Sequence, residues 1–255
     1  SVQGSEIDMR GSQSGARDIA LQARAGDIDL SQAETIARDG AALQAADAVM
    51  TAQGQLGANH ITVQAQDLDN AGGRIVQREA RTLHLDLPGT LDNRDGQIVT
   101  AGDLDIRLGG DLDNRAGSLY AQGDSHIDSG RRLRNSGVIA AQGDLALAAE
   151  TLESSAGSLL AAGVDGTGRF VDGARTLRAE ARQTAQAQGQ TAASGDVMLA
   201  GASVDVRGGQ LSGTALEIVA ETGDIDAREA SLSARDRLAL RTQQESTDVT
   251  SFGRR

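Results

Sequence analysis

The side chains that could do chemistry in this sequence are carboxylates and imidazoles. The 255 residues include 36 Asp and Glu and three His, but no Cys. Two carboxylates held in a cleft can serve as general acid and base in the cleavage of glycosidic bonds. With so many acidic residues some pair always lies at a suitable distance, so proximity alone indicates little. The absence of Cys excludes disulfides and a thiolate nucleophile.

The three histidines, His60, His84 and His126, are the natural candidates for metal binding. They stand far apart along the chain, and none occurs in a metal-binding spacing such as His-x-x-x-His. A sugar-cleaving site also needs aromatic platforms, and aromatic residues make up only 1% of the chain. We therefore expect surface histidines, no catalytic residues, no metal or cofactor, and no enzymatic activity. An enzyme that acts on polysaccharides remains a remote alternative.

The charge balance indicates which partners are unsuitable. All 24 basic residues are Arg, and the formal net charge is -12. Nucleic acid and anionic membranes would be repelled, so we expect neither as a partner. No stretch of 18 apolar residues occurs, which argues against membrane insertion. The start SVQGSEID is not a signal peptide, so we expect a section of a longer protein.

The elements that position these side chains are repeats. Leu68-Asp69-Asn70 recurs at nearly regular intervals as Leu91-Asp92-Asn93, Leu112-Asp113-Asn114, Leu133-Arg134-Asn135 and Leu152-Glu153-Ser154. Between these motifs, aliphatic residues alternate with polar ones over three to five positions and then meet Gly or Asn. This pattern is typical of short strands with one buried face, joined by tight turns.

Such short strands are stable only when each repeat coils once and pairs with the next. We therefore predict an all-β fold, a parallel β-helix of about 12 rungs of roughly 19–23 residues. Leu68, Leu91, Leu112, Leu133 and Leu152 should form an inward aliphatic stack. Asn70, Asn93, Asn114 and Asn135 should form a structural ladder of amides in the turns, and Ser154 should end it because a hydroxyl cannot repeat both amide bonds.

Two outward columns of charge accompany the ladder. The pairs Gly102-Asp103, Gly123-Asp124 and Gly143-Asp144 would stack carboxylates about 5 Å apart, so these must face solvent or hold cations. One carboxylate per rung supplies too few oxygens for calcium, which favours solvated turns. Arg94 and Arg115 share a column with neighbouring Asp residues. We expect a salt-bridged surface there, and a patch for acidic sugars is the alternative.

A longer repeat organises the chain as a single β-helix fragment over residues 1–255. Residues 201–240 align without a gap to residues 4–43 with 16 of 40 identities, an offset of 197 residues. We therefore expect the most regular rungs at 68–163 and a second copy of rungs 1–58 at 195–255. Residues 164–194 lack the Leu-Asp-Asn motif. Two interpretations stay open for them, irregular rungs with a thin Ala core or a helical or loop insertion.

These nested motifs resemble the repeat region of the filamentous haemagglutinin family, the large exoproteins of Gram-negative two-partner secretion systems. The resemblance implies a right-handed β-helical filament, exported through an outer-membrane secretion barrel, then secreted and displayed on the cell surface. The family includes adhesins and the filaments of contact-dependent growth inhibition. We therefore expect a structural and adhesive rod that attaches to a receptor on host cells or other bacteria, with a passive spacer stalk as the alternative. The sequence does not identify receptor-binding residues.

Overall fold

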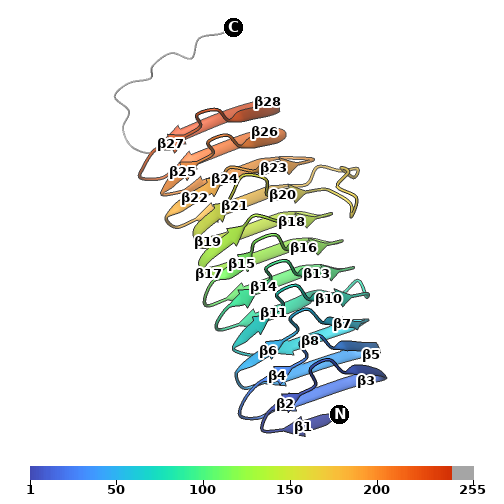
Figure 1. Ribbon diagram of the computed structural model, residues 1–255. Helices are drawn as coiled ribbons and strands as arrows, with labels where there is room; N and C mark the ends of the chain where they lie inside the picture. The colour runs from blue at the N-terminus through green and yellow to red at the C-terminus, as the bar shows by residue number, and fades with distance from the viewer. Residues whose placement is uncertain (243–255) are drawn as a thin grey trace.

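The computed structural model describes residues 1–242, which form a rod of strands wound around one axis (Figure 1). All 28 strands belong to one continuous sheet, and neighbouring strands pair in parallel. Residues 1–242 contain no helix, and therefore none with the length and apolar character needed to cross a membrane. The predicted all-β parallel β-helix is confirmed, with about 11 turns where about 12 were expected.

Each turn passes over three faces of the rod. Face 1 holds β2 (Ile7–Asp8), β4 (Ile28–Asp29), β6 (Ala48–Met50), β9 (Asp67–Asp69), β12 (Leu91–Asp92), β15 (Leu112–Asn114), β22 (Thr184–Ala187), β25 (Ser203–Asp205) and β27 (Ile225–Asp226). Face 2 holds β7 (Gln55–Ala58), β10 (Arg74–Gln77), β13 (Gln97–Thr100), β16 (Ser118–Ala121), β18 (Val138–Ala141), β20 (Leu159–Ala162) and β23 (Gln190–Ala193). Face 3 holds β1 (Val2–Gly4), β8 (His60–Gln64), β11 (Leu83–Leu87), β14 (Leu104–Leu108), β21 (Leu177–Ala181) and β24 (Val197–Gly201).

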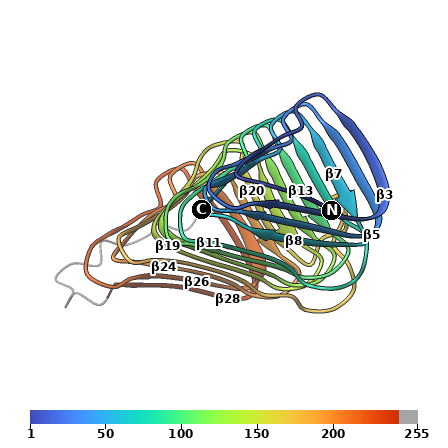
Figure 2. The same ribbon diagram turned by 90° about the horizontal axis from the view of Figure 1, so that it is seen from below.

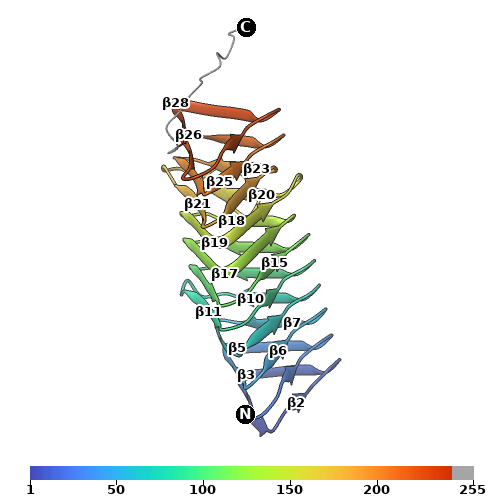
Figure 3. The ribbon, with the colours of Figure 1, turned by 90° about the vertical axis from the view of Figure 1, so that its left-hand side faces the viewer.

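Six longer strands bend around a corner and belong to two faces. β3 (Gln13–Ala23), β5 (Glu34–Ala45), β26 (Gln210–Ala220) and β28 (Ser231–Thr242) run from face 2 to face 3, and β17 (Ser125–Asn135) and β19 (Leu145–Ser154) run from face 3 to face 1. Their register shifts at the corner, for example between Ala16 and Asp18 of β3. Such bulges let a strand turn without ending, and Figure 3 shows these bent strands from the side.

The turns enclose one interior, as the view along the rod shows (Figure 2), and stacked aliphatic columns fill it. Face 1 contributes eleven inward residues that pair in register, Ile7, Ile28, Val49, Leu68, Leu91, Leu112, Leu133, Leu152, Ala185, Val204 and Ile225. Inward and outward residues alternate along each strand, as in β14, where Leu104, Ile106 and Leu108 are buried. The buried core contains no aromatic side chain among the described residues.

The long repeat also appears in the strand boundaries. β26 lies 197 residues after β3, β27 lies 197 residues after β4, and β28 lies 197 residues after β5. Residues 243–255 of the expected second copy lie outside the described residues.

Residues 164–194 divide into two parts. The short segment 142–144 connects β18 to β19, whereas the much longer segment 163–176 connects the equivalent strands β20 and β21. This longer connection is a loop with one isolated bridge between Val164 and Phe170. From Leu177 onward the chain returns to the rungs as β21, β22 and β23, whose inward residues are mainly Ala. This one turn therefore departs from the nearly regular rung length that the earlier motifs predict.

Candidate functional site

The four asparagines of the Leu-Asp-Asn motifs form a continuous chain of hydrogen bonds inside the rod. Asn70 Nδ2 donates to Asn93 Oδ1 at 2.7 Å, Asn93 Nδ2 to Asn114 Oδ1 at 2.7 Å, and Asn114 Nδ2 to Asn135 Oδ1 at 2.9 Å. All four side chains are at most 1% exposed. Since a buried amide is costly when unpaired, these bonds satisfy polar groups that could not reach water.

Hydroxyl side chains terminate this chain at both ends. Thr51 Oγ1 donates to Asn70 Oδ1 at 2.8 Å, one turn before the first asparagine. At the other end Asn135 Nδ2 donates to Ser154 Oγ at 3.3 Å, and Ser154 Oγ lies 2.7 Å from Ser158 Oγ. Sequence reasoning missed Thr51 and Ser158. The signal for Thr51 was its position one repeat before Asn70.

The five leucines of the motifs stack directly beside these asparagines. Leu68 pairs with Leu91, Leu91 with Leu112, Leu112 with Leu133, and Leu133 with Leu152. Leu68 is 1% exposed, and the other four are fully buried. Each leucine therefore packs on the leucine of the turn above and below it, which gives the rod a continuous apolar column.

The Gly-Asp pairs connect the backbone of one turn to the carboxylate of the previous one. Asp103 Oδ1 accepts a hydrogen bond from the Asp124 amide at 2.9 Å, Asp124 Oδ1 from the Asp144 amide at 2.8 Å, and Asp144 Oδ1 from the Thr176 amide at 2.8 Å. The three carboxylates are exposed. Their negative charge thus faces solvent while one oxygen of each is held by the fold.

A second outward column consists of Asp residues that each hold the Arg two positions later. Arg94 Nη2 lies 2.5 Å from Asp92 Oδ2, and Arg115 Nη2 lies 2.6 Å from Asp113 Oδ2. The same pairing occurs at Asp8 and Arg10, Asp205 and Arg207, and Asp226 and Arg228. A longer contact of 4.0 Å, from Arg94 Nε to Asp113 Oδ2, connects neighbouring turns.

These ion pairs lower the pKa of their carboxyl groups. The Arg10 guanidinium hydrogen-bonds to Asp8 and lowers its pKa to about 2, and Arg228 does the same to Asp226. At Asp113, partial burial opposes the shift, but the hydrogen bonds from Arg115 still leave the pKa below its usual value. Such carboxylates stay ionised at neutral pH, so they suit surface stability better than proton transfer.

Two of the three histidines lie in one column, which their sequence spacing did not suggest. On face 3, His84 of β11 pairs in register with Asp105 of β14, and Asp105 pairs with His126 of β17. The wide separation of His84 and His126 along the chain therefore corresponds to two turns. His60 lies elsewhere on the same face and contacts Thr62. Among residues 1–242, no group of three His, Cys, Asp or Glu side chains is arranged so that it could hold a metal ion as it stands.

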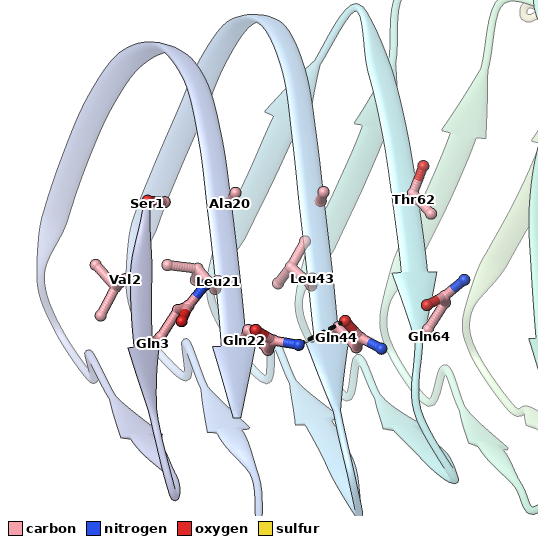
Figure 4. Close-up of a pocket in the computed structure, with 11 residues that line it drawn as sticks. Ser1, Val2, Gln3, Ala20, Leu21, Gln22, Leu43, Gln44, Thr62 and Gln64 are labelled. Carbon is pink, nitrogen blue, oxygen red and sulfur yellow. Dashed lines mark hydrogen bonds between the residues drawn. The ribbon is translucent and has the colours of Figure 1, made fainter. Parts of the chain in front are cut away.

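The hollows on the rod differ in the side chains that line them. A hollow of about 240 Å³ at the first turns is lined by residues such as Val2, Leu21 and Gln22, and Gln22 Nε2 donates to Gln44 Oε1 at 3.0 Å (Figure 4). It has no acidic, basic or histidine side chain. A groove of about 700 Å³ lies beside the 163–176 loop and includes Phe170, Asp172 and Arg235.

The 163–176 loop is held in a defined shape against the rod. Asp165 Oδ1 accepts hydrogen bonds from Thr167 and Arg169, and the Asp165 amide donates to the Arg169 carbonyl. Ser194 Oγ, on the next turn, donates to the Gly173 carbonyl at 2.8 Å. Phe170 is 55% exposed in this loop. The hydrogen-bonded loop therefore exposes the apolar ring of Phe170 to solvent.

Comparisons with known proteins agree with this architecture. The family model described as haemagglutinin repeat matches residues 13–148, 99–168 and 160–244. Toxin CdiA of Yersinia pestis is 31% identical over 231 residues, which are 91% of this chain and 6% of that protein. The chain thus spans a small part of the relative it matches. No solved structure matches it. The resemblance found in the sequence motifs is confirmed, and this chain belongs to the haemagglutinin repeat family.

Proposed function

We propose that this chain is a passive structural segment of a secreted surface filament, which holds other parts of a larger protein away from the cell. The observation that carries the proposal is the unbroken ladder along the rod. β19 pairs with both β21 and β22, so the parallel pairing continues past the 163–176 loop. Turns spaced about 4.8 Å apart give the described part a length of roughly 50 Å.

The stacks described above suit such a mechanical role. Backbone hydrogen bonds run along the axis between every pair of turns, and the leucine and asparagine columns run parallel to them. A pull along the rod is therefore shared among many bonds of similar strength. The acidic, ion-paired exterior keeps the rod soluble, and many of its carboxylates are bound by Arg or by backbone amides, as at Asp92 and Asp103.

Membership of the haemagglutinin repeat family supports the part of this proposal that concerns secretion to the cell surface. Proteins of two-partner secretion leave a Gram-negative cell through an outer-membrane barrel, which would be the partner of this chain during export. The similarity to a protein named Toxin CdiA favours a spacer in contact-dependent growth inhibition over other family roles. A rod that positions a distant domain requires no catalytic residues.

Adhesion is the second candidate, and the 163–176 loop favours it. The loop breaks the regular surface, exposes Phe170 and borders the groove that contains Asp172 and Arg235. An exposed ring beside polar side chains is a common composition for a binding surface. A receptor on host cells or other bacteria would then contact this loop rather than the regular turns.

Removal of one whole repeat tests the spacer function. In the full-length protein, deletion of residues 13–209 joins residue 12 to Gln210, the equivalent of Gln13, and keeps every strand in register. A spacer predicts a shorter filament that still delivers its effector. A control deletion that ends ten residues earlier, residues 13–199, joins residue 12 to Ala200 inside β24 and puts the strands out of register, so it should disrupt the rod at the junction. Complete loss of delivery by the in-register deletion, with normal secretion, would contradict the spacer function.

Binding measurements on the isolated chain test adhesion. Fluorescently labelled chain is added to epithelial cells and to Gram-negative bacteria, together with a variant that lacks residues 164–174. That deletion leaves three connecting residues, as between β18 and β19, so the fold should persist. Saturable binding that is lost in this variant and in Phe170→Ala, but kept in the exposed control Leu238→Ala, would favour adhesion. Absence of binding to either cell type would favour the spacer.

A further inference from the structure

An outward patch on face 3 combines histidines and carboxylates in a way that no other part of the described chain repeats. It covers three consecutive strands, β11, β14 and β17, and centres on Asp105. His84 precedes Asp105 by one turn and His126 follows it by one turn, so the two imidazoles flank the carboxylate. Neither the mechanical role of the rod nor the loop beside Phe170 uses these residues.

One oxygen of the Asp105 carboxylate contacts two neighbouring side chains, whereas the other accepts no hydrogen bond. Its Oδ2 lies 3.2 Å from His84 Nδ1 and 3.0 Å from Arg107 Nη2. Its Oδ1 is out of contact with water and has no hydrogen-bond partner. The Asp105 side chain is 16% exposed, whereas that of His84 is 67% exposed. A carboxylate oxygen without a partner favours a cation at this position.

The charges around Asp105 favour the same kind of ligand. Counting the position just before each strand, the outward residues are Thr82, His84 and Asp86 for β11, Asp103, Asp105 and Arg107 for β14, and Asp124, His126 and Asp128 for β17. Five of these nine residues are Asp and one is Arg, so the patch carries a net charge of -4 when both His are neutral. Neutral residues Thr62 and Ala146 lie beyond it in the histidine column.

The spacing of the turns suits one metal ion above Asp105. Neighbouring turns are about 4.8 Å apart, so an ion midway between His84 and His126 is about 5 Å along the axis from each histidine backbone. An imidazole together with a metal–nitrogen bond of about 2.1 Å covers that span. The His84 side chain already contacts Asp105. A change of side-chain rotamer at His126 brings the second imidazole to the same ion.

We propose that His84, Asp105 and His126 bind a divalent transition-metal ion, such as Zn²⁺, and thereby clip three consecutive turns together. Two imidazole nitrogens and one carboxylate are the donors that Zn²⁺, Co²⁺ and Ni²⁺ prefer, whereas Ca²⁺ and Mg²⁺ need more oxygens. The remaining positions around the ion are open to water. Arg107 releases Asp105 when the ion binds, and its positive charge weakens the site.

Isothermal titration of the intact chain with Zn²⁺ tests the site. We expect one ion per chain, and His84→Ala or His126→Ala should each weaken binding by at least about tenfold. The control His60→Ala removes a histidine of the same face outside the patch and should leave affinity unchanged. Arg107→Gln should tighten binding, and Ca²⁺ at the same concentration should give no comparable heat.

Two further readouts distinguish ligation from general attraction to the acidic surface. Zn²⁺ should raise the unfolding temperature of the parent chain but not that of the His84→Ala, His126→Ala double variant. Affinity should also fall in acid, because protons compete with the metal ion for imidazole nitrogens. Equal Zn²⁺ affinity in the parent chain and the double variant, or no stoichiometric binding at all, would overturn the proposal. Neither outcome affects the proposed spacer function.

Discussion

The carboxylate of Asp103 occupies the space that a side chain on Gly123 would need. A Cβ built on Gly123 would lie well inside van der Waals contact with Asp103 Oδ1, which accepts a hydrogen bond from the neighbouring Asp124 amide at 2.9 Å. Gly143 stands in the same relation to Asp124. The Gly-Asp motif is therefore a contact between turns, in which each Gly makes room for the Asp of the turn before.

Gly123→Ala should destabilise the rod because the methyl group displaces the Asp103 carboxylate or shifts the backbone. We expect a loss of about 1–3 kcal/mol in the free energy of unfolding, measured by urea denaturation. Gly15→Ala is the matched control, since a Cβ there meets no atom within 4 Å. The double variant Asp103→Ala, Gly123→Ala should recover part of the loss. If the two single Ala variants unfold at the same urea concentration, the steric explanation is wrong.

Asn114→Ala should cost more stability than Arg115→Ala. Asn114 is fully buried and bonds to both Asn93 and Asn135, so its loss removes one side-chain partner from each of these buried amides and should cost about 2–4 kcal/mol. Arg115 forms an ion pair with Asp113 at the surface, where solvent screens the charges, so its removal should cost much less. Thermal unfolding of the two variants compares them directly, and equal midpoints would contradict a stabilising role for the ladder.

Ala116→Gly should stabilise the protein. Ala116 has a φ of 55°, and Gly72 occupies the equivalent turn position with a φ of 64°. Relief of the left-handed strain should exceed the entropy cost of glycine and add up to about 1 kcal/mol. Ala146→Gly, within β19, is the control and should destabilise by roughly 0.5–1 kcal/mol. A lower unfolding midpoint for Ala116→Gly would show that the turn is not strained.

Acid should destabilise the rod through its Asp-Arg pairs. The pKa of Asp8 and of Asp226 is about 2 in the folded chain, against 3.8 for an unperturbed Asp. Depressed carboxyl pKa values stabilise the fold above pH 3.8, and that contribution is lost as the pH falls toward 2. Arg10→Gln with Arg228→Gln should therefore show a smaller loss of stability between pH 4 and 2 than the parent chain. Arg131→Gln, at an Arg without an ion pair among residues 1–242, should behave like the parent.

The sequence was sufficient to predict the fold because the repeated motifs indicate which residues of neighbouring turns pair. Each Leu-Asp-Asn motif places its leucine inward, and the spacing of the motifs sets the length of each turn. Beyond Ser154 the motif disappears, and alanine is compatible with rungs, loops and helices alike. Residues 163–176 and 177–193 therefore could not be distinguished from composition, although the first form a loop and the second form strands.

The contacts between turns were predictable only where one residue type repeats. The asparagine column was visible, but the hydroxyl ends at Thr51 and Ser158 belong to other residue types. His84, Asp105 and His126 were missed because a metal spacing was sought within one element, whereas a solenoid brings together residues separated by whole turns. The outward columns of Asp were predicted, but the bond from each Gly-Asp carboxylate to the next turn was not, since its partner is a backbone amide.

The hydrogen bonds from backbone amides to Asp carboxylates of the neighbouring turn all run in one direction along the rod, and this direction bears on how the rod folds. In each case the acceptor belongs to the earlier turn and the amide to the later one, from Asp103 to Asp124, Asp124 to Asp144, and Asp144 to Thr176. A chain that emerges amino end first would therefore meet, at each of these turns, a carboxylate acceptor that the preceding turn already holds in place. Only the first turns bear the cost of nucleation, and each later turn adds to a finished end. For such a chain we expect the rod to grow from its amino end, with each added turn opposing retreat of the chain.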